Sequence, residues 1–259
     1  MRGRLLSLAV ALLISVSSAP GLAQWLNHPT PGIPRLPDGN PDFFAPTPRT
    51  ADGKPDLSGL WLPNTPYVVN AKGGADPPGQ VPFQPWAEAV YRQRYDNFGL
   101  DDPSAYCIPG GVPRVNLIPY PFRIVTAPGR VVMLYEIYYL WREIFTDGRE
   151  LPVDPNPTWM GYSVGRWEED LFVVRSSGFN GKAWLDTEGR PTTDALQVTE
   201  RFHRRDFGHM DLEMIVADPK AYTRPWAIRV PLSFYADTEM LEYACAENNK
   251  YPLFRPQRP

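Results

Sequence analysis

Alternation of hydrophobic and polar residues dominates the second half of the chain. Between Met210 and Val216 every second residue is hydrophobic, and acidic residues stand among them. Leu196 to Arg204 shows a similar alternation, which Glu200 interrupts on the apolar side. Because successive side chains of a strand point to opposite faces, both segments predict half-buried antiparallel strands.

Runs of this kind, separated by turn residues such as Pro128-Gly129, predict roughly nine or ten strands. They span residues 57–61, 122–127, 131–145, 160–167, 171–176, 196–204, 210–216, 226–234 and 240–245. Short turns join most neighbours. The expected fold class is therefore mainly β: an antiparallel up-and-down, lipocalin-like barrel or a strongly curled sheet.

One of these runs is too long for a single strand of a small domain. Val131 to Phe145 would span roughly 50 Å at about 3.3 Å per residue. We therefore expect a bulge or bend near Tyr138–Tyr139.

Proline limits the amount of helix. The chain has 31 proline residues, and proline is excluded from helix interiors and central strands. The one helix we expect is Pro85–Phe98, which starts with proline, carries apolar residues at helical spacing and is followed by Gly99.

The N-terminus has the pattern of a secretory signal peptide over residues 1–23. Arg2 and Arg4 precede an apolar run from Leu5 to Val16, and small residues follow. The run is short for a membrane span, so no stable membrane insertion is expected. Removing the two arginines takes the formal net charge from −3 to −5. The predicted location is secreted or periplasmic.

The rest of the chain divides into three parts. Residues 24–56 form a proline-rich extension that we expect to wrap against the body. It contains a short echo, Asp38–Asp42 and Asp52–Asp56, which predicts two surface turns. Residues 57–250 are expected to form a single β-barrel-like domain, and residues 251–259 a tail.

Composition narrows the range of partners. The chain is 43% hydrophobic, which is ample for a core, and 21% charged. The small net charge does not suggest nucleic acid, which calls for a basic stripe. The expected partner is a small-molecule ligand, and the oligomeric state is left open.

The chain has two cysteines, Cys107 and Cys245. Export would place them in an oxidising compartment, and only one pairing exists within the chain. We expect a disulfide that ties the central region to the last predicted strand.

Several motifs resemble those of known proteins. Gly59-Leu-Trp61 resembles the first strand of lipocalin-like barrels. Further motifs are Phe145–Arg149, Asp154–Glu168, Thr199–Phe202, Cys107–Arg114 and Glu242–Cys245. Together they resemble a widespread family of secreted bacterial proteins, over roughly residues 52–248. The resemblance implies the fold and export but no activity. The chain departs from that pattern at Glu169, where glycine is expected, and at Thr192, where histidine is frequent.

Charged residues inside an apolar run mark the first candidate site. Glu136, Tyr138 and Arg142 stand at even spacing, so an unbroken strand would place them on one face. A buried carboxylate and guanidinium must be paired or bound to something. The alternatives are a structural ion pair of Arg142, with Glu136 or Asp147, and a polar catalytic cluster in an apolar cavity. The predicted bend would separate Glu136 from Arg142.

The sequence leaves three alternative functions open, and the first two use this cluster. The first is a secreted protein that binds a small, largely apolar or aromatic molecule in the barrel. The second is a cofactor-free acid–base lyase, isomerase or hydratase that uses Glu136, Tyr138, Arg142 and His209. The third is a structural or interaction protein of the cell envelope.

Aromatic residues and one arginine are the candidate ligand contacts, because rings stack on flat apolar ligands. The set is Arg149, Trp159, Tyr162, Trp167 and Trp184. The alternative for the rings is that they belong to the core.

Two further motifs are interpreted as structural. Gly161–Gly165 matches Gly-x-Ser-x-Gly, but a nucleophile elbow needs a strand before the serine and a helix after it, whereas a hairpin is predicted here. The three histidines form no metal-ligand motif, so no metal site is predicted, and no cofactor is expected.

Overall fold

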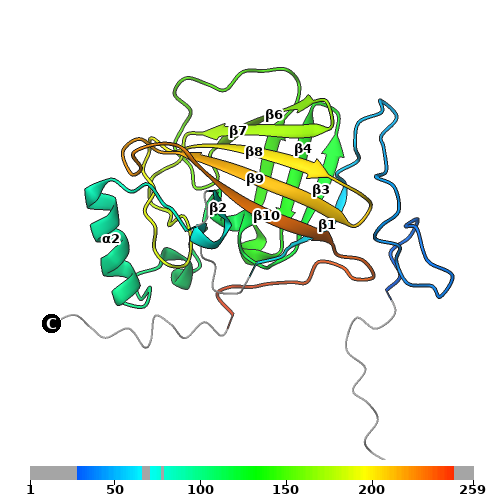
Figure 1. The fold of residues 1–259 in the computed structure, drawn as a ribbon, viewed down its shortest axis with the longest axis horizontal. Coiled ribbons are helices and arrows are strands. Elements are labelled where there is room, and N and C mark those ends of the chain that lie inside the picture. The colour runs from blue at the N-terminus through cyan, green and yellow to red at the C-terminus, as the bar shows by residue number, and fades with distance from the viewer. Residues whose placement is uncertain (1–27, 66–70, 77–78, 248–259) are drawn as a thin grey trace, which may run out of the picture.

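The structure is a computed structural model, and it describes residues 28–65, 71–76 and 79–247. Ten strands form one sheet (Figure 1). They are β1 (Gly59–Pro63), β2 (Ala75–Asp76), β3 (Phe122–Ala127), β4 (Arg130–Tyr135), β5 (Trp141–Phe145), β6 (Tyr162–Glu168), β7 (Leu171–Ser177), β8 (Gln197–Arg204), β9 (His209–Ala217) and β10 (Trp226–Phe234). The predicted signal peptide and the tail 251–259 lie outside the described residues.

Nine of these strands close into a ring. The order runs from β1 through β3 to β10, and β1 also pairs with β10, with Trp61 opposite Phe234. β2 pairs with the other half of β10, at Ala227 and Ile228. The predicted mainly β, closed barrel is confirmed.

One pair of neighbours in the ring is parallel. β5 and β6 pair in parallel at two positions, Ile144 with Ser163 and Phe145 with Val164. An odd number of strands in a ring cannot alternate in direction throughout, so a nine-stranded barrel needs one parallel pair. Parallel neighbours require a long connection, and the proline-rich segment 146–161 supplies it. We call the β5–β6 junction the seam.

The predicted bend between Val131 and Phe145 is present. A short 3-10 turn (η4, Ile137–Tyr139) separates β4 from β5, and Tyr138 and Tyr139 have φ angles of 58° and 51°. The bend changes which residues face inward. Met133 and its alternate neighbours are buried in β4, whereas Arg142 and Ile144 are buried in β5.

The predicted last strand, residues 240–245, is wrong. No strand follows β10 in the described part of the chain, and the hairpin expected around Ala236 is absent from it. β1 already occupies the edge of β10 near Phe234, so the ring leaves no place for a further strand there. Residues 235–247 instead run irregularly beside the barrel, where the Leu241 N–H donates to the Glu136 carboxylate.

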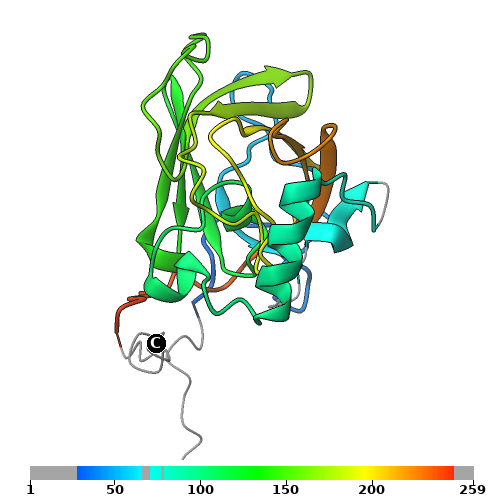
Figure 2. The ribbon, with the colours of Figure 1, turned by 90° about the vertical axis from the view of Figure 1, so that its left-hand side faces the viewer.

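The predicted helix is confirmed as α2 (Pro85–Asp96), the one α-helix among residues 28–65, 71–76 and 79–247. Only Ala87 of α2 is buried, so most of its surface is open to solvent. Figure 2 shows α2 on one flank of the molecule and the green β3–β5 wall on the opposite flank. The seam on that wall is therefore not covered by α2.

The interior of the barrel is filled with side chains. Its largest fully buried members are Trp61, Arg142, Tyr135, Phe122, Phe172, Phe202, Met133 and Ile144. Residues 110–118 are all buried and include the turn η3 (Arg114–Asn116), which carries Asn116 into the core. A filled interior places any ligand site of this barrel in its wall or on its surface.

The echo in the N-terminal extension is a repeated turn. Arg35 donates to the Gly39 carbonyl at 2.9 Å, and Arg49, fourteen positions later, donates to the Gly53 carbonyl at 2.8 Å. Both arginines also bind carboxylates of the body, Arg35 at Asp237 and Arg49 at Asp170. The two predicted surface turns are thus alike in structure and are both attached to the barrel.

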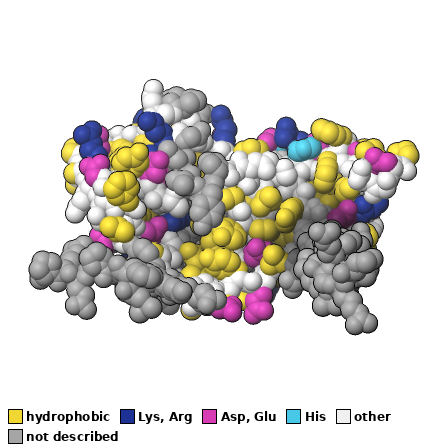
Figure 3. All heavy atoms as spheres, turned by 90° about the horizontal axis from the view of Figure 1, so that it is seen from below, with side chains coloured by type: hydrophobic (Ala, Val, Ile, Leu, Met, Phe, Trp, Pro, Cys, Tyr) yellow, Lys and Arg dark blue, Asp and Glu magenta, His cyan; other side chains and the backbone are white. Residues whose placement is uncertain are grey.

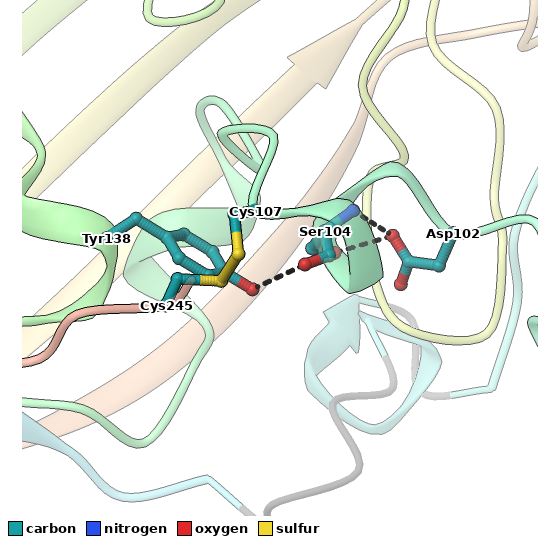
Figure 4. Close-up of a disulfide and its surroundings, with 5 residues drawn as sticks. All are labelled: Asp102, Ser104, Cys107, Tyr138 and Cys245. Atoms are coloured by element: carbon teal, nitrogen blue, oxygen red, sulfur yellow. Dashed lines mark hydrogen bonds between the residues drawn. A yellow bond between two sulfur atoms is a disulfide. The ribbon is translucent and has the colours of Figure 1, made fainter. Parts of the chain in front are cut away.

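The predicted disulfide is present between Cys107 and Cys245. Tyr138 lies beside it and donates to the Ser104 carbonyl at 3.2 Å, while Ser104 binds the Asp102 carboxylate (Figure 4). The bond therefore fixes residues 235–247 to the loop before β3. Among the described helices, none has the length and apolar character to cross a membrane.

Candidate functional site

A buried ion pair lies across the barrel wall next to the seam. Arg142 of β5 binds both carboxylate oxygens of Glu200 of β8, one at 2.9 Å. It also donates to Ser163 of β6 at 3.0 Å and to Ser176 of β7 at 2.7 Å. The four side chains come from four successive strands of the ring, and all are buried.

The same network continues to the core loop. Asn116 donates to Glu200 at 2.6 Å and accepts from the Tyr135 hydroxyl at 2.9 Å. Burial raises the pKa of Tyr135 above its ordinary value. Burial alone would lower the pKa of Arg142, but the charge and hydrogen bonds of Glu200 outweigh it and raise that pKa. Both groups are therefore held in their protonated forms.

The guanidinium of Arg142 is occupied by the protein itself. Its Nε and both terminal nitrogens donate to Glu200 and the two serines. It is paired with Glu200, and not with Glu136 or Asp147. We therefore interpret Arg142 as part of the wall behind the seam, where it shapes the site without binding a ligand charge.

The structure does not bring the four proposed acid–base residues together. Glu136 is buried beside residues 235–247, where it accepts from the Leu241 N–H, and Tyr138 lies beside the disulfide. His209, the first residue of β9, binds Asp206 of the preceding turn through Nδ1 at 2.7 Å. The physical reason for the first separation is the η4 bend, which places Glu136 and Arg142 on different faces.

An apolar groove opens along the seam. It has a volume of about 510 Å³, which lies in the range of small-molecule sites. One wall consists of Tyr139, Leu140, Trp141 and Phe145, and the other of Trp159, Met160 and Tyr162. We call this feature the seam groove. Its base reaches Arg142 and Ser163.

Aromatic side chains define the shape of the seam groove. Phe145 and Tyr162 stack across the seam with ring centres 5.2 Å apart. Trp141 and Tyr139 are 64% and 52% exposed, so large apolar surfaces are open to a ligand. Figure 3 shows hydrophobic side chains gathered in the middle of the underside of the molecule, with acidic side chains beside them.

Three of the five predicted ligand contacts are at this groove. Trp159 and Tyr162 line it, and Arg149 donates to the Tyr162 hydroxyl at 2.9 Å. Arg149 also lies over the Phe145 ring, 3.9 Å from its centre. The guanidinium therefore supports two of the lining rings from outside the groove.

The other two predicted contacts lie elsewhere. Trp167 packs on Phe172, with ring centres 5.2 Å apart. Trp184 is buried beneath the Arg94 guanidinium, 4.5 Å from its ring centre. Neither lines the seam groove.

A larger depression lies beside α2 but has a different character. Its volume is about 840 Å³, and its lining is mostly polar, with Gln93, Arg94, Asp96, Asn97 and Asp101. A lining of this kind does not suit an apolar ligand. The seam groove combines the apolar walls and few polar groups of a typical ligand site.

Sequence reasoning missed Trp141 and Tyr139. A signal for Trp141 was available, because a residue next to the buried Arg142 in a strand must point to the opposite face. An exposed tryptophan on the outside of a barrel indicates a contact surface. Ser163, the centre of Gly161–Gly165, is buried and hydrogen-bonded to Arg142, in agreement with the structural interpretation of that motif.

These features define the class of protein: a closed nine-stranded β-barrel with a filled interior and an apolar groove at its seam. None of the family models, curated proteins and solved structures compared with the chain matches it. The resemblance to secreted bacterial proteins therefore stays a prediction. Within the described residues, no cluster of three or more histidine, cysteine or acidic side chains could hold a metal ion.

Proposed function

We propose that this protein is exported and binds a small, largely apolar or aromatic molecule in the seam groove. The observation that carries the proposal is the pair of facing aromatic walls, Trp141 with Tyr139 and Trp159 with Tyr162, around a space of about 510 Å³. The proposal moves the expected site from the barrel interior to the barrel wall. The intramolecular disulfide supports export to an oxidising compartment.

Binding of the apolar aromatic anion 1-anilinonaphthalene-8-sulfonate tests the proposal. Its fluorescence rises in an apolar site, so a titration yields an affinity. We expect Trp141→Ala and Trp159→Ala each to weaken binding about tenfold, since each removes an aromatic contact of roughly 1.4 kcal/mol.

Trp86→Ala is the matched control, because Trp86 is also a partly exposed tryptophan, 45% exposed, but lies on α2. It should bind the probe as the unmodified protein does. Equal affinities for all three variants would place the probe outside the seam groove and contradict the proposal.

The acid–base alternative receives no support from the placement of Glu136, Tyr138, Arg142 and His209. Glu136 and Tyr138 bind protein groups near residues 235–247, His209 binds Asp206, and Arg142 is held by Glu200. We therefore propose binding alone.

A further inference from the structure

The seam leaves part of β5 without a second neighbour. All five residues of β5 pair with β4, but only Ile144 and Phe145 pair with β6. Trp141–Glu143 therefore forms a strand edge along the seam groove. An unpaired edge presents main-chain N–H and C=O groups that can pair with another extended chain.

The ladder between β4 and β5 fixes the direction of these groups. The Tyr135 N–H donates to the Leu140 carbonyl at 2.8 Å, and the Thr146 N–H donates to the Gly129 carbonyl at 2.9 Å. Both pairs belong to one continuous register. In an antiparallel ladder, hydrogen-bonded pairs alternate with non-hydrogen-bonded pairs.

Within β5, Arg142 and Ile144 are therefore the residues whose main-chain N–H and C=O groups bond to β4. The main-chain groups of Trp141 and Glu143 point the other way, into the seam. The parallel pairing of Ile144 with Ser163 uses the Glu143 carbonyl, so the groups left without a strand partner are the N–H and C=O of Trp141 and the N–H of Glu143. Gly161 has a φ of 70°, and the chain around it turns away before it can pair with this edge. Neither the Trp141 nor the Glu143 N–H donates to any described residue outside the strands.

The groove thus places a strip of polar main chain between apolar walls. Trp141 and Tyr139 stand on the β5 side, and Trp159 and Met160 stand opposite. A ligand that matches both features needs amide donors and acceptors along its length and apolar side groups on its flanks. An extended peptide has this chemistry, and strand addition to a free edge is a recurring mode of peptide recognition.

We propose that the natural ligand class of the seam groove is a short extended peptide, or a peptide-like amide, with apolar or aromatic side chains that adds a strand to β5. This inference rests on the proposed function, because it identifies the ligand of the same groove. An edge of three residues is about 10 Å long, so it accommodates about three residues of the ligand.

Two substitutions at Glu143 separate main-chain pairing from side-chain contacts. Glu143→Pro removes the N–H that faces the groove, and the β4–β5 ladder does not use that N–H. Glu143→Ala is the matched control, since it also removes the ion pair with Arg130 but keeps the N–H. The probe is acetyl-Leu-Phe-Leu-amide, compared with the same peptide methylated on its main-chain nitrogens.

Binding is measured by calorimetry in the full chain. We expect Glu143→Pro to bind the peptide about tenfold more weakly than Glu143→Ala, which corresponds to the loss of one hydrogen bond. The methylated peptide should bind the unmodified protein at least about tenfold more weakly than the parent peptide. Binding of 1-anilinonaphthalene-8-sulfonate should be equal in both variants.

The outcomes distinguish the two proposals. If the aromatic probe binds the groove but the peptide does not bind, or if the methylated peptide binds as tightly as its parent, strand addition is wrong and the proposed function stands. If neither the aromatic probe nor the peptide binds, the proposed function is wrong as well. Should Glu143→Pro lose its folded circular dichroism spectrum, the two peptides on the unmodified protein decide the question.

Discussion

At the scale of single residues, the most consequential contact is the buried pair of Arg142 and Glu200. Both were visible in the sequence as charges that interrupt apolar strands. Their pairing was not predictable, because the two residues are 58 positions apart in the chain and meet only when β5 and β8 are brought into one ring, with β6 and β7 between them. Removing one partner of a buried ion pair leaves the other charge uncompensated.

Glu200→Gln should therefore lower the free energy of unfolding by about 3–5 kcal/mol. Urea unfolding followed by circular dichroism measures the change. Glu168→Gln is the control, because Glu168 forms an exposed ion pair with Arg166 and should change stability by less than about 1 kcal/mol. A small effect of Glu200→Gln, similar to that of the control, would show that Arg142 finds other compensation.

The alternation rule also explains why Glu136 and Arg142 were grouped. The rule assigns faces correctly within β4 and within β5. The three residues of η4 interrupt the alternation, so odd-numbered residues are buried in β4 and even-numbered residues in β5. The sequence predicted the bend from strand length, yet its direction depends on the positive φ angles of Tyr138 and Tyr139. Neither residue type favours such angles, so nothing local indicated which face each side of the bend would present.

At the scale of elements, α2 and the strands differ in how well the sequence predicted them. The strands β7 to β10 follow from alternation because one face of each is buried. Helix α2 was predicted two residues too long, since Phe98 fits the apolar spacing but has a φ of 53° and is 92% exposed. The left-handed conformation at Phe98 ends the helix at a position that favours glycine.

Phe98→Gly should therefore stabilise α2 by about 0.5–1 kcal/mol, because glycine adopts this conformation without steric cost while losing some chain entropy. Slower hydrogen exchange of the α2 amides would report the gain. Phe98→Ala removes the same exposed ring but keeps a Cβ, so it should produce no such slowing. Equal exchange rates in the two variants would contradict this explanation of the helix end.

At the scale of the whole molecule, the closure of the ring locates the candidate site. Nine strands require one parallel pair, and that pair joins at only two positions. The weak junction leaves the free edge of β5 and the groove beside it. The sequence predicted a barrel and two of the groove residues, Trp159 and Tyr162, but strand number alone did not indicate where the ring would close.

The most direct test of a ligand site at the seam is hydrogen exchange of the full chain with and without 1-anilinonaphthalene-8-sulfonate. We expect the bound probe to slow exchange in peptides that cover residues 139–145 and 158–163, and to leave α2 and the turn at His209 unchanged. Slowing confined to peptides away from these two segments, with none at the seam, would contradict the account.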